Sequence, residues 1–385
     1  MSLRTSLPLA ALLAALLAPL SQAAPTGIGI GLKPGDRSNI PTKGKVTERP
    51  APVTVLSLSA DGKSLWVGDA NGRLRSFALT LAPEGGGELG PEAVLPWKDA
   101  RQAASIEAIL VRPERTWIAL DGGTFARATT SAIVATATRQ REGVLALVAG
   151  PEGRLAAASA EGEIRIYDPQ GGLQNTIRAH GVATIALASE PGKTPRIWSL
   201  GWDGRLCAWR WPKPAKPAKK GKGKGKVGAA RAGHRRQSGR SRRASARKLD
   251  KPRFELDLGQ REPTSLALIP LSDPKAKERH LIVADFQGRL RRVELAKRKL
   301  TSAPYKSRPN MELISALALS PSGERGVALA SAEQTLLLFD PQDPERIPLV
   351  LQRFEIPPAR ALFLSETTVA VGFYDGNVRL IKVAK

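Results

Sequence analysis

The sequence contains few cysteines and histidines, and these shortages exclude several kinds of site. Among its 385 residues Cys207 is the single cysteine, so neither an intramolecular disulfide framework nor a cysteine-based zinc site can form. His180, His234 and His280 lack the spacing of metal ligands, and the chain contains no Gly-x-x-x-x-Gly-Lys-Ser/Thr phosphate loop. We therefore expect a protein without a bound metal or cofactor.

Long apolar segments are equally scarce, and the one that occurs is short. It spans residues 7–20, which is 14 residues, whereas a membrane-spanning helix needs about 20. One positive charge precedes this run, and Ser21 and Ala23 supply the small residues of a signal-peptidase site. We expect residues 1–23 to be a signal peptide cleaved near Ala23, followed by a flexible leader at residues 24–44. The mature chain would then be periplasmic or secreted, with no transmembrane segment.

Acidic residues are absent from residues 213–249, which hold 15 of the 59 Lys and Arg residues. Without these 15 charges and that of Arg4, the net charge falls from +24 to +8, an ordinary value for a globular body. The stretch has too little apolar surface to offset its ordering entropy, so we expect a disordered insertion. Such clustered cations bind polyanions non-specifically, and no aromatic residue is interleaved for base stacking. The alternative is a solvated loop that binds nothing. The candidate polyanion-binding residues are Lys219, Lys220, Arg235, Arg236, Arg240, Arg242 and Arg243.

A β-rich unit recurs along residues 45–385, in a chain that is 42% hydrophobic. Two copies are VLSLSADGKSLWVGDANGRLRSFAL at 55–79 and VLALVAGPEGRLAAASAEGEIRIYD at 144–168. Units of about 40 to 50 residues with four short strands are typical of β-propeller blades. We expect an all-β, seven-bladed β-propeller of four-stranded antiparallel blades, with residues 213–249 inserted in blade four. The second turns of the seven units are marked by Gly72, Gly122, Gly162, Gly204, Gly288, Gln334 and Gly376.

The last unit contains three strands rather than four, at about 360–364, 367–374 and 377–383. An unpaired edge between the first and last blades would favour aggregation. The segment Lys45–Arg49 precedes the first inner strand. We expect it to supply the missing strand and to close the ring as an N-terminal clasp.

The fourth unit carries four residues at the positions of a known repeat signature. His180 precedes its first strand, Ser199 lies in its second, Asp203 in the turn and Trp209 in its third. Through these residues the chain resembles the WD-repeat β-propeller family, in an exported bacterial form. The resemblance implies a hydrogen-bonded tetrad that locks blade four. It is incomplete, because an arginine follows Trp209 where the family has aspartate, and the other units lack the histidine.

Ser199, His180 and Asp203 also resemble a nucleophilic triad in composition. A catalytic serine needs an exposed oxygen and an oxyanion hole, whereas Ser199 lies inside the strand sequence RIWSLGW. We therefore expect these residues to be structural.

Three large aromatic residues precede the acid or amide of the same turn, namely Trp202, Phe286 and Tyr374 in units four, five and seven. The resemblance implies that this position contacts partners, and exposed aromatic side chains are typical interface anchors. The alternative is partial packing against neighbouring blades. The strand order places these turns on one face of the ring and the basic insertion on the opposite face.

These features predict an exported, monomeric, non-catalytic scaffold that binds an unidentified protein or ligand on the face with the glycine turns. The insertion would add attachment to a polyanion. One alternative is a protein whose main function is non-specific binding of nucleic acid, anionic lipid or acidic polysaccharide. Another is a periplasmic propeller enzyme, such as a lactonase or quinoprotein. That enzyme would need a polar funnel of acids, histidines or metal ligands, which the sequence does not supply.

Overall fold

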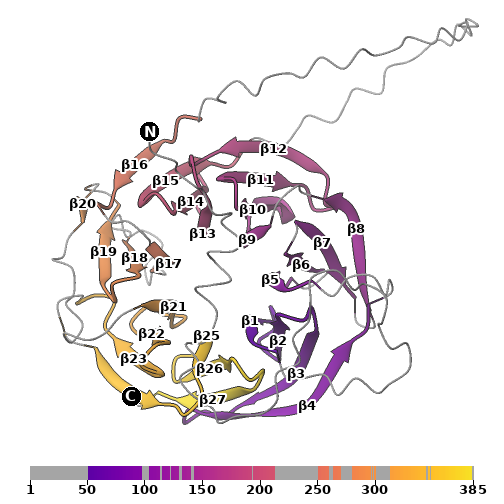
Figure 1. Ribbon diagram of the computed structural model, residues 1–385, viewed down its shortest axis with the longest axis vertical. Helices are drawn as coiled ribbons and strands as arrows, with labels where there is room; N and C mark the ends of the chain where they lie inside the picture. Colours follow the sequence, from indigo (N-terminus) through magenta and orange to yellow (C-terminus); the bar gives the residue numbers. More distant parts are fainter. Residues whose placement is uncertain are drawn as a thin grey trace, which may run out of the picture. The chain divides into compact units, whose positions relative to one another are not determined.

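Seven small sheets are arranged as a ring in the computed structural model (Figure 1). The chain divides into two units, Met1–Glu48 and Arg49–Lys385, and every residue described below belongs to the second. The structure describes residues 51–97, 104–112, 115–121, 123–129, 132–139, 143–192, 194–212, 250–259, 263–269, 280–295, 297, 299–300, 313–343, 346 and 348–383. The predicted signal peptide, leader, clasp and basic insertion lie outside these residues.

Each of the first four sheets has four antiparallel strands in sequence order. Blade one contains β1 (Val53–Leu58), β2 (Ser64–Asp69), β3 (Leu74–Leu81) and β4 (Gly87–Leu95). Blade two contains β5 (Ile106–Leu110), β6 (Thr116–Leu120), β7 (Thr124–Ala128) and β8 (Ile133–Arg139). Blade three contains β9 (Val144–Ala149), β10 (Leu155–Ser159), β11 (Glu163–Tyr167) and β12 (Leu173–Arg178), with a short 3-10 turn at Pro151–Gly153. Blade four contains β13 (Thr184–Glu190), β14 (Arg196–Gly201), β15 (Arg205–Arg210) and β16 (Phe254–Asp257).

The remaining three sheets continue the same pattern, except that the last has three strands among the described residues. Blade five contains β17 (Pro263–Leu268), β18 (His280–Asp285), β19 (Leu290–Glu294) and β20 (Lys299–Leu300). Blade six contains β21 (Ile314–Leu319), β22 (Gly326–Ala330), β23 (Thr335–Phe339) and β24 (Leu349–Arg353). Blade seven contains β25 (Pro358–Ser365), β26 (Thr368–Phe373) and β27 (Val378–Lys382). The predicted seven-bladed, all-β fold is confirmed.

The turn between the second and third strands recurs with one geometry. In blade one, the Gly72 amide donates to the Asp69 carbonyl at 3.1 Å, and Gly72 has a φ of 78° that suits glycine. In blade two, Gly123 holds this position, with a φ of 78° and a 3.1 Å bond to Leu120. The prediction of Gly122 as the marker was therefore wrong by one residue. The sequence Asp-Gly-Gly offers two adjacent glycines, and local pattern does not choose between them.

The hydrophobic core is divided among the interfaces between adjacent blades. Each of the seven clusters of buried residues combines side chains from two neighbouring blades. Between blades four and five, for example, Trp198 packs edge-on against Phe254 at 5.2 Å between ring centroids, in one cluster with Val283. A blade therefore buries its apolar faces only when both of its neighbours are in place.

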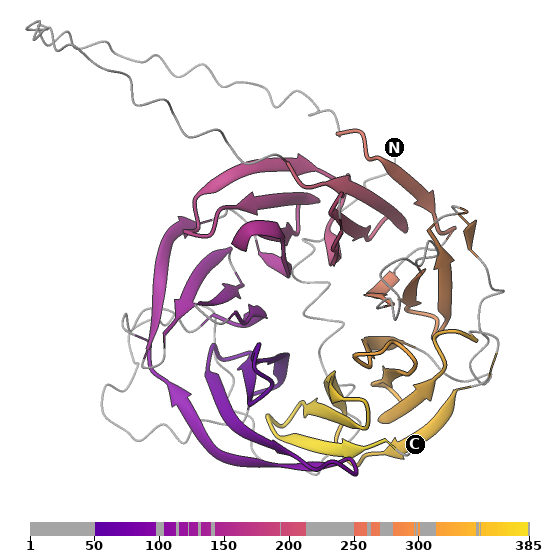
Figure 2. The ribbon, with the colours of Figure 1, turned by 180° about the vertical axis from the view of Figure 1, so that it is seen from behind.

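The seam between blades seven and one is packed like the other six. Its core joins Val53 and Leu65 of blade one to Leu364 and Ala370 of blade seven. Figure 2 shows the sequence colours running once around the ring, so that the first and last blades are neighbours.

Polar contacts also cross this seam. At the inner edge, the Arg360 Nε donates to the Thr54 carbonyl at 2.5 Å. Further out, the long hairpin of β3 and β4 reaches blade seven, where the Gly86 amide donates to Thr368 Oγ1 at 2.9 Å. Strand β4 lies beside β27 (Figure 1). The described residues thus close the ring through packing and this hairpin, while the predicted clasp at Lys45–Arg49 stays a prediction.

Candidate functional site

The four signature residues of blade four lie together, with Ser199, His180 and Trp209 buried and Asp203 half-buried in the turn. The Trp209 Nε1 donates to Ser199 Oγ at 2.9 Å, and the His180 Nε2 lies 2.9 Å from the same oxygen. The His180 Nδ1 lies 3.3 Å from Asp203 Oδ1. The Ser199 hydroxyl is therefore engaged by two side chains. Ser199 is also 0% exposed, so no substrate can reach its oxygen. The arrangement suits a packing network and does not suit a nucleophilic serine.

Asp203 of this network and the neighbouring Cys207 have shifted pKa values. Partial burial raises the pKa of Asp203, but the His180 side chain and the Arg205 backbone amide outweigh it and bring the pKa below its usual value. Cys207 pairs with Ser199 across β14 and β15. Burial raises the pKa of the Cys207 thiol to about 12, so the thiol is protonated and unreactive at neutral pH while blade four is closed.

We expect Asp203→Ala to destabilise blade four by about 1 to 3 kcal/mol, because it leaves the buried His180 Nδ1 without its carboxylate. Opening of the blade exposes Cys207, the single thiol of the chain. The rate of thiol labelling under native conditions should then rise by about 5- to 150-fold. Asp375→Ala is the matched control, because among the described residues the Asp375 carboxylate bonds only to Asn377, in an exposed turn. Equal labelling rates and denaturation midpoints for both variants would refute the tetrad.

The turns between second and third strands lie on one face of the ring, which we call the glycine-turn face. Trp202, Phe286 and Tyr374 occupy its predicted aromatic position in blades four, five and seven, and all three side chains are half-buried. Their backbone is fixed, since the Trp202 amide donates to the Ala183 carbonyl at 2.9 Å. In the part of the chain that the structure describes, no ring contact joins the three to one another. The three side chains are therefore spread around the face rather than gathered in one cluster.

Arg360 is a polar residue near this face that the sequence analysis did not single out. Its guanidinium also donates to the Ala359 carbonyl at 2.9 Å. Burial lowers the pKa of Arg360, while the nearby Glu107 and Tyr374 act in the opposite direction. An isolated arginine in an inner strand gives no sequence signal, because its neighbours come from other blades.

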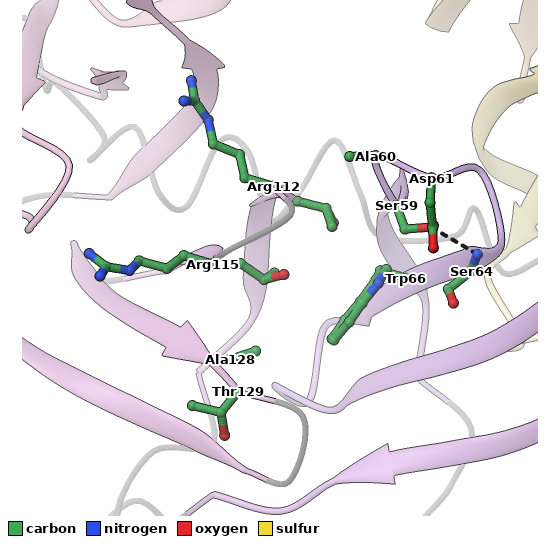
Figure 3. Close-up of a pocket in the computed structure, with 11 residues that line it drawn as sticks. Ser59, Ala60, Asp61, Ser64, Trp66, Arg112, Arg115, Ala128 and Thr129 are labelled. Carbon is green, nitrogen blue, oxygen red and sulfur yellow. Dashed lines mark hydrogen bonds between the residues drawn. The ribbon is translucent and has the colours of Figure 1, made fainter. Parts of the chain in front are cut away.

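Two clefts lie on the opposite face, which we call the insertion face because β15 and β16 flank the insertion there. The first, about 600 Å³, lies between blades one and two and is lined by Asp61, Trp66 and Thr129, among others (Figure 3). The second, about 490 Å³, lies between blades two and three, and Arg112 and Arg115 line both.

The guanidinium groups of Arg112 and Arg115 point away from Trp66 and the first cleft (Figure 3). The Arg112 Nη2 donates to the Gly150 and Arg154 carbonyls at 3.2 and 3.1 Å. The Arg115 Nη1 donates to the Pro169 carbonyl. The two guanidinium groups therefore link blade two to blade three through hydrogen bonds. The aliphatic parts of the two side chains line the first cleft.

The described residues on either side of the basic insertion are anchored to blade three. Trp211 is buried under Arg154, whose guanidinium carbon lies 5.6 Å from the indole centroid and which also donates to the Pro212 carbonyl. On the other side, the Arg178 amide donates to Asp250 Oδ2 at 2.8 Å. The seven candidate residues of the insertion itself, at positions 219–243, lie outside the described residues.

Comparison with known proteins gives matches to solved structures alone. No protein-family model and no curated protein matches the chain. Among solved structures, the chain is similar to the crystal structure of the WD40 beta propeller domain of Doa1, with a TM-score of 0.61 and 11% identity. That alignment covers 86% of this chain and 93% of the other. At this identity the likeness establishes the WD40-type propeller fold and nothing about the ligand.

Within the described ranges, no helix is long and apolar enough to cross a membrane. The same residues contain no group of three or more His, Cys, Asp or Glu side chains placed to hold a metal ion.

Proposed function

We propose that this protein is an exported, monomeric, non-catalytic scaffold that binds a protein partner through its glycine-turn face. The observation that carries the proposal is the repeated placement of Trp202, Phe286 and Tyr374, each half-exposed on a turn whose backbone is held by the blade. Aromatic side chains on a rigid support lose little entropy on binding and are typical energetic centres of interfaces. Propeller folds are widely used to present such surfaces.

The non-catalytic part of the proposal is supported by the state of the blade-four network. Its buried Ser199 is engaged by His180 and Trp209, and the half-buried Asp203 lies 3.3 Å from the other ring nitrogen of His180. Export is supported by the apolar segment at residues 7–20 and the small residues that follow it.

The double variant Trp202→Ala, Phe286→Ala tests the partner surface. We expect it to weaken the partner complex by about 2 kcal/mol, or about 30-fold, with little dependence on salt. Tagged full-length protein should be recovered from the envelope fraction with Ala24 as its first residue. Its cross-linked partner should be identified and then titrated in purified form.

The control is Leu349→Ala, which removes an apolar side chain that is 60% exposed on the outer strand β24, away from the glycine-turn face. Equal losses of affinity in both variants would contradict the assignment of the binding face.

A second function, attachment to a polyanion through the insertion, is favoured by a separate observation. Residues 213–249 carry 15 cationic residues and no acid. The chain that leads into and out of them is fixed to blade three by Trp211 and Asp250. The two binding functions would therefore use opposite faces and should be independent.

A further inference from the structure

The seven blades provide an internal comparison at one position of the second strand. In each blade, the residue at this place in the register packs in the apolar cluster shared with the next blade. Six of the seven residues are at most 3% exposed, whereas Trp66 of β2 is only half-buried. The seven residues are Trp66, Trp117, Ala156, Trp198, Ile282, Val327 and Ala370.

The other two tryptophans at this position have contacts that Trp66 lacks. The Trp198 Nε1 donates to Glu190 Oε2 at 2.7 Å. The ring of Trp117 lies below the Arg115 guanidinium, whose carbon is 5.9 Å from the indole centroid. Within the described part of the chain, the Trp66 indole has no hydrogen-bond partner and no aromatic or cation contact. Packing therefore accounts for one side of this ring and leaves the rest uncovered.

The uncovered part of Trp66 lies at the first cleft, the cavity of about 600 Å³ between blades one and two (Figure 3). Thr116 also lines this cleft and is 6% exposed, and its hydroxyl has no hydrogen-bond partner among the described residues. The same holds for the hydroxyl of Ser64, which is half-buried in the lining. Hydroxyl groups in such places are normally hydrogen-bonded, so these two are available to a ligand.

Asp61 adds an exposed carboxylate to the lining of the cleft. Its Oδ1 accepts the Ser59 hydroxyl at 2.6 Å and the Lys63 amide at 3.1 Å. These two bonds hold the pKa of Asp61 below its ordinary value, so the carboxyl group is ionised at neutral pH. Its Oδ2 bonds to no described residue and is free to accept a hydrogen bond from a ligand.

The charges around the cleft favour a neutral ligand. A cation would meet the Asp61 carboxylate, but it would also meet the positive side chains of Lys63, Arg112 and Arg115. An anion would meet the same carboxylate. Both guanidinium groups of the lining are directed away from Trp66, to carbonyls of blade three (Figure 3). A neutral molecule rich in hydroxyl groups avoids both conflicts.

We propose that the first cleft binds a neutral sugar ring, which stacks on the Trp66 indole and donates hydroxyl hydrogen bonds to Asp61. The face of an indole carries negative charge density, which attracts the C–H groups on the flat face of a pyranose. The hydroxyls of Ser64 and Thr116 can donate to and accept from those of the sugar. An aromatic wall with a few polar groups is the usual construction of a small-molecule site. This site is separate from the glycine-turn face and requires no charge on its ligand.

The test titrates cellotriose and tri-N-acetylchitotriose into the full chain and measures binding by calorimetry. The two sugars share one β-linked glucose-type backbone, so the tighter binder distinguishes a plain glucan from an N-acetylated glycan as the source. We expect binding that does not depend on salt. Trp66→Leu should bind about 10-fold more weakly, and Trp66→Phe, which keeps an aromatic face, should lose less. Asp61→Asn should bind about 5-fold more weakly, because an amide oxygen accepts less strongly than a carboxylate.

The matched control is Trp202→Leu, which removes a half-buried indole from the opposite face and should bind both sugars like the parent. Urea midpoints show whether each variant is folded, and Asp61→Asn, in an exposed turn, tests the site if Trp66→Leu does not fold. The proposal is wrong if neither sugar binds the parent, or if Trp66→Leu and Asp61→Asn bind as tightly as the parent. Binding of trilysine or inorganic pyrophosphate that is lost in Trp66→Leu would assign the cleft to an ion and overturn the sugar. None of these results alters the proposed partner surface at Trp202.

Discussion

Replacing Gly372 with valine should destabilise the protein by about 3 kcal/mol and open the ring at the seam between blades seven and one. Gly372 lies in β26, opposite Arg360 of β25. A Cβ at position 372 would lie 2.5 Å from Val53 Cγ1 and 2.8 Å from Val53 Cβ, on the inner strand of blade one. The neighbouring side chains are already close-packed, so the extra volume must push the two blades apart.

The matched control is Gly181→Val, because a Cβ at Gly181 meets no atom within 4 Å. We expect this control to change the free energy of unfolding by less than about 0.5 kcal/mol. Urea denaturation measures the stability, and gel filtration shows whether the Gly372→Val chain exposes strand edges and self-associates. A monomeric Gly372→Val protein with the midpoint of the parent would show that the seam is not under packing constraint.

The fold was predictable because the same strand–turn–strand pattern recurs along the sequence. A turn that needs positive φ recurs at Gly72, Gly162 and Gly204 between apolar strands, and this period identifies the blades and their number. The blade-four residues were predictable for a similar reason, since the resemblance assigns His180 and Ser199 to fixed positions of one unit. The likeness to a solved WD40 propeller supports the fold.

Features that depend on contacts between blades were not predictable. The Arg360 bond to Thr54 joins residues 306 positions apart, and Arg112 reaches carbonyls of the next blade. No local sequence pattern predicts contacts between residues so far apart in the chain. The pairing of Ser199 with Cys207 depends instead on register, which the turn between β14 and β15 sets by its length. That pairing could be predicted from the sequence once the position of the turn was known.

Replacing five arginines of the insertion with glutamine should flatten the salt dependence of polyanion binding. The five are Arg235, Arg236, Arg240, Arg242 and Arg243. Binding by clustered cations is driven by release of counterions from the polymer, with a slope of about −0.9 per neutralised phosphate on double-stranded DNA. Loss of five contacts should therefore make the slope shallower by about 4.5. The affinity of the parent should itself fall by about 10³-fold or more between 50 and 200 mM salt.

The same five positions changed to lysine are the control that separates charge from side-chain geometry. Lysine keeps every charge, so the lysine variant should retain the slope of the parent, and neither variant should shift the urea midpoint. Binding should not depend on base sequence, because nothing in the insertion is arranged to read base edges. Partner binding through Trp202 and Phe286 should be unaffected in both variants, since those residues lie on the opposite face. A glutamine variant that binds DNA as tightly as the parent at every salt concentration would mean that the insertion is a spacer. The 15 charges of residues 213–249 would then serve solubility alone.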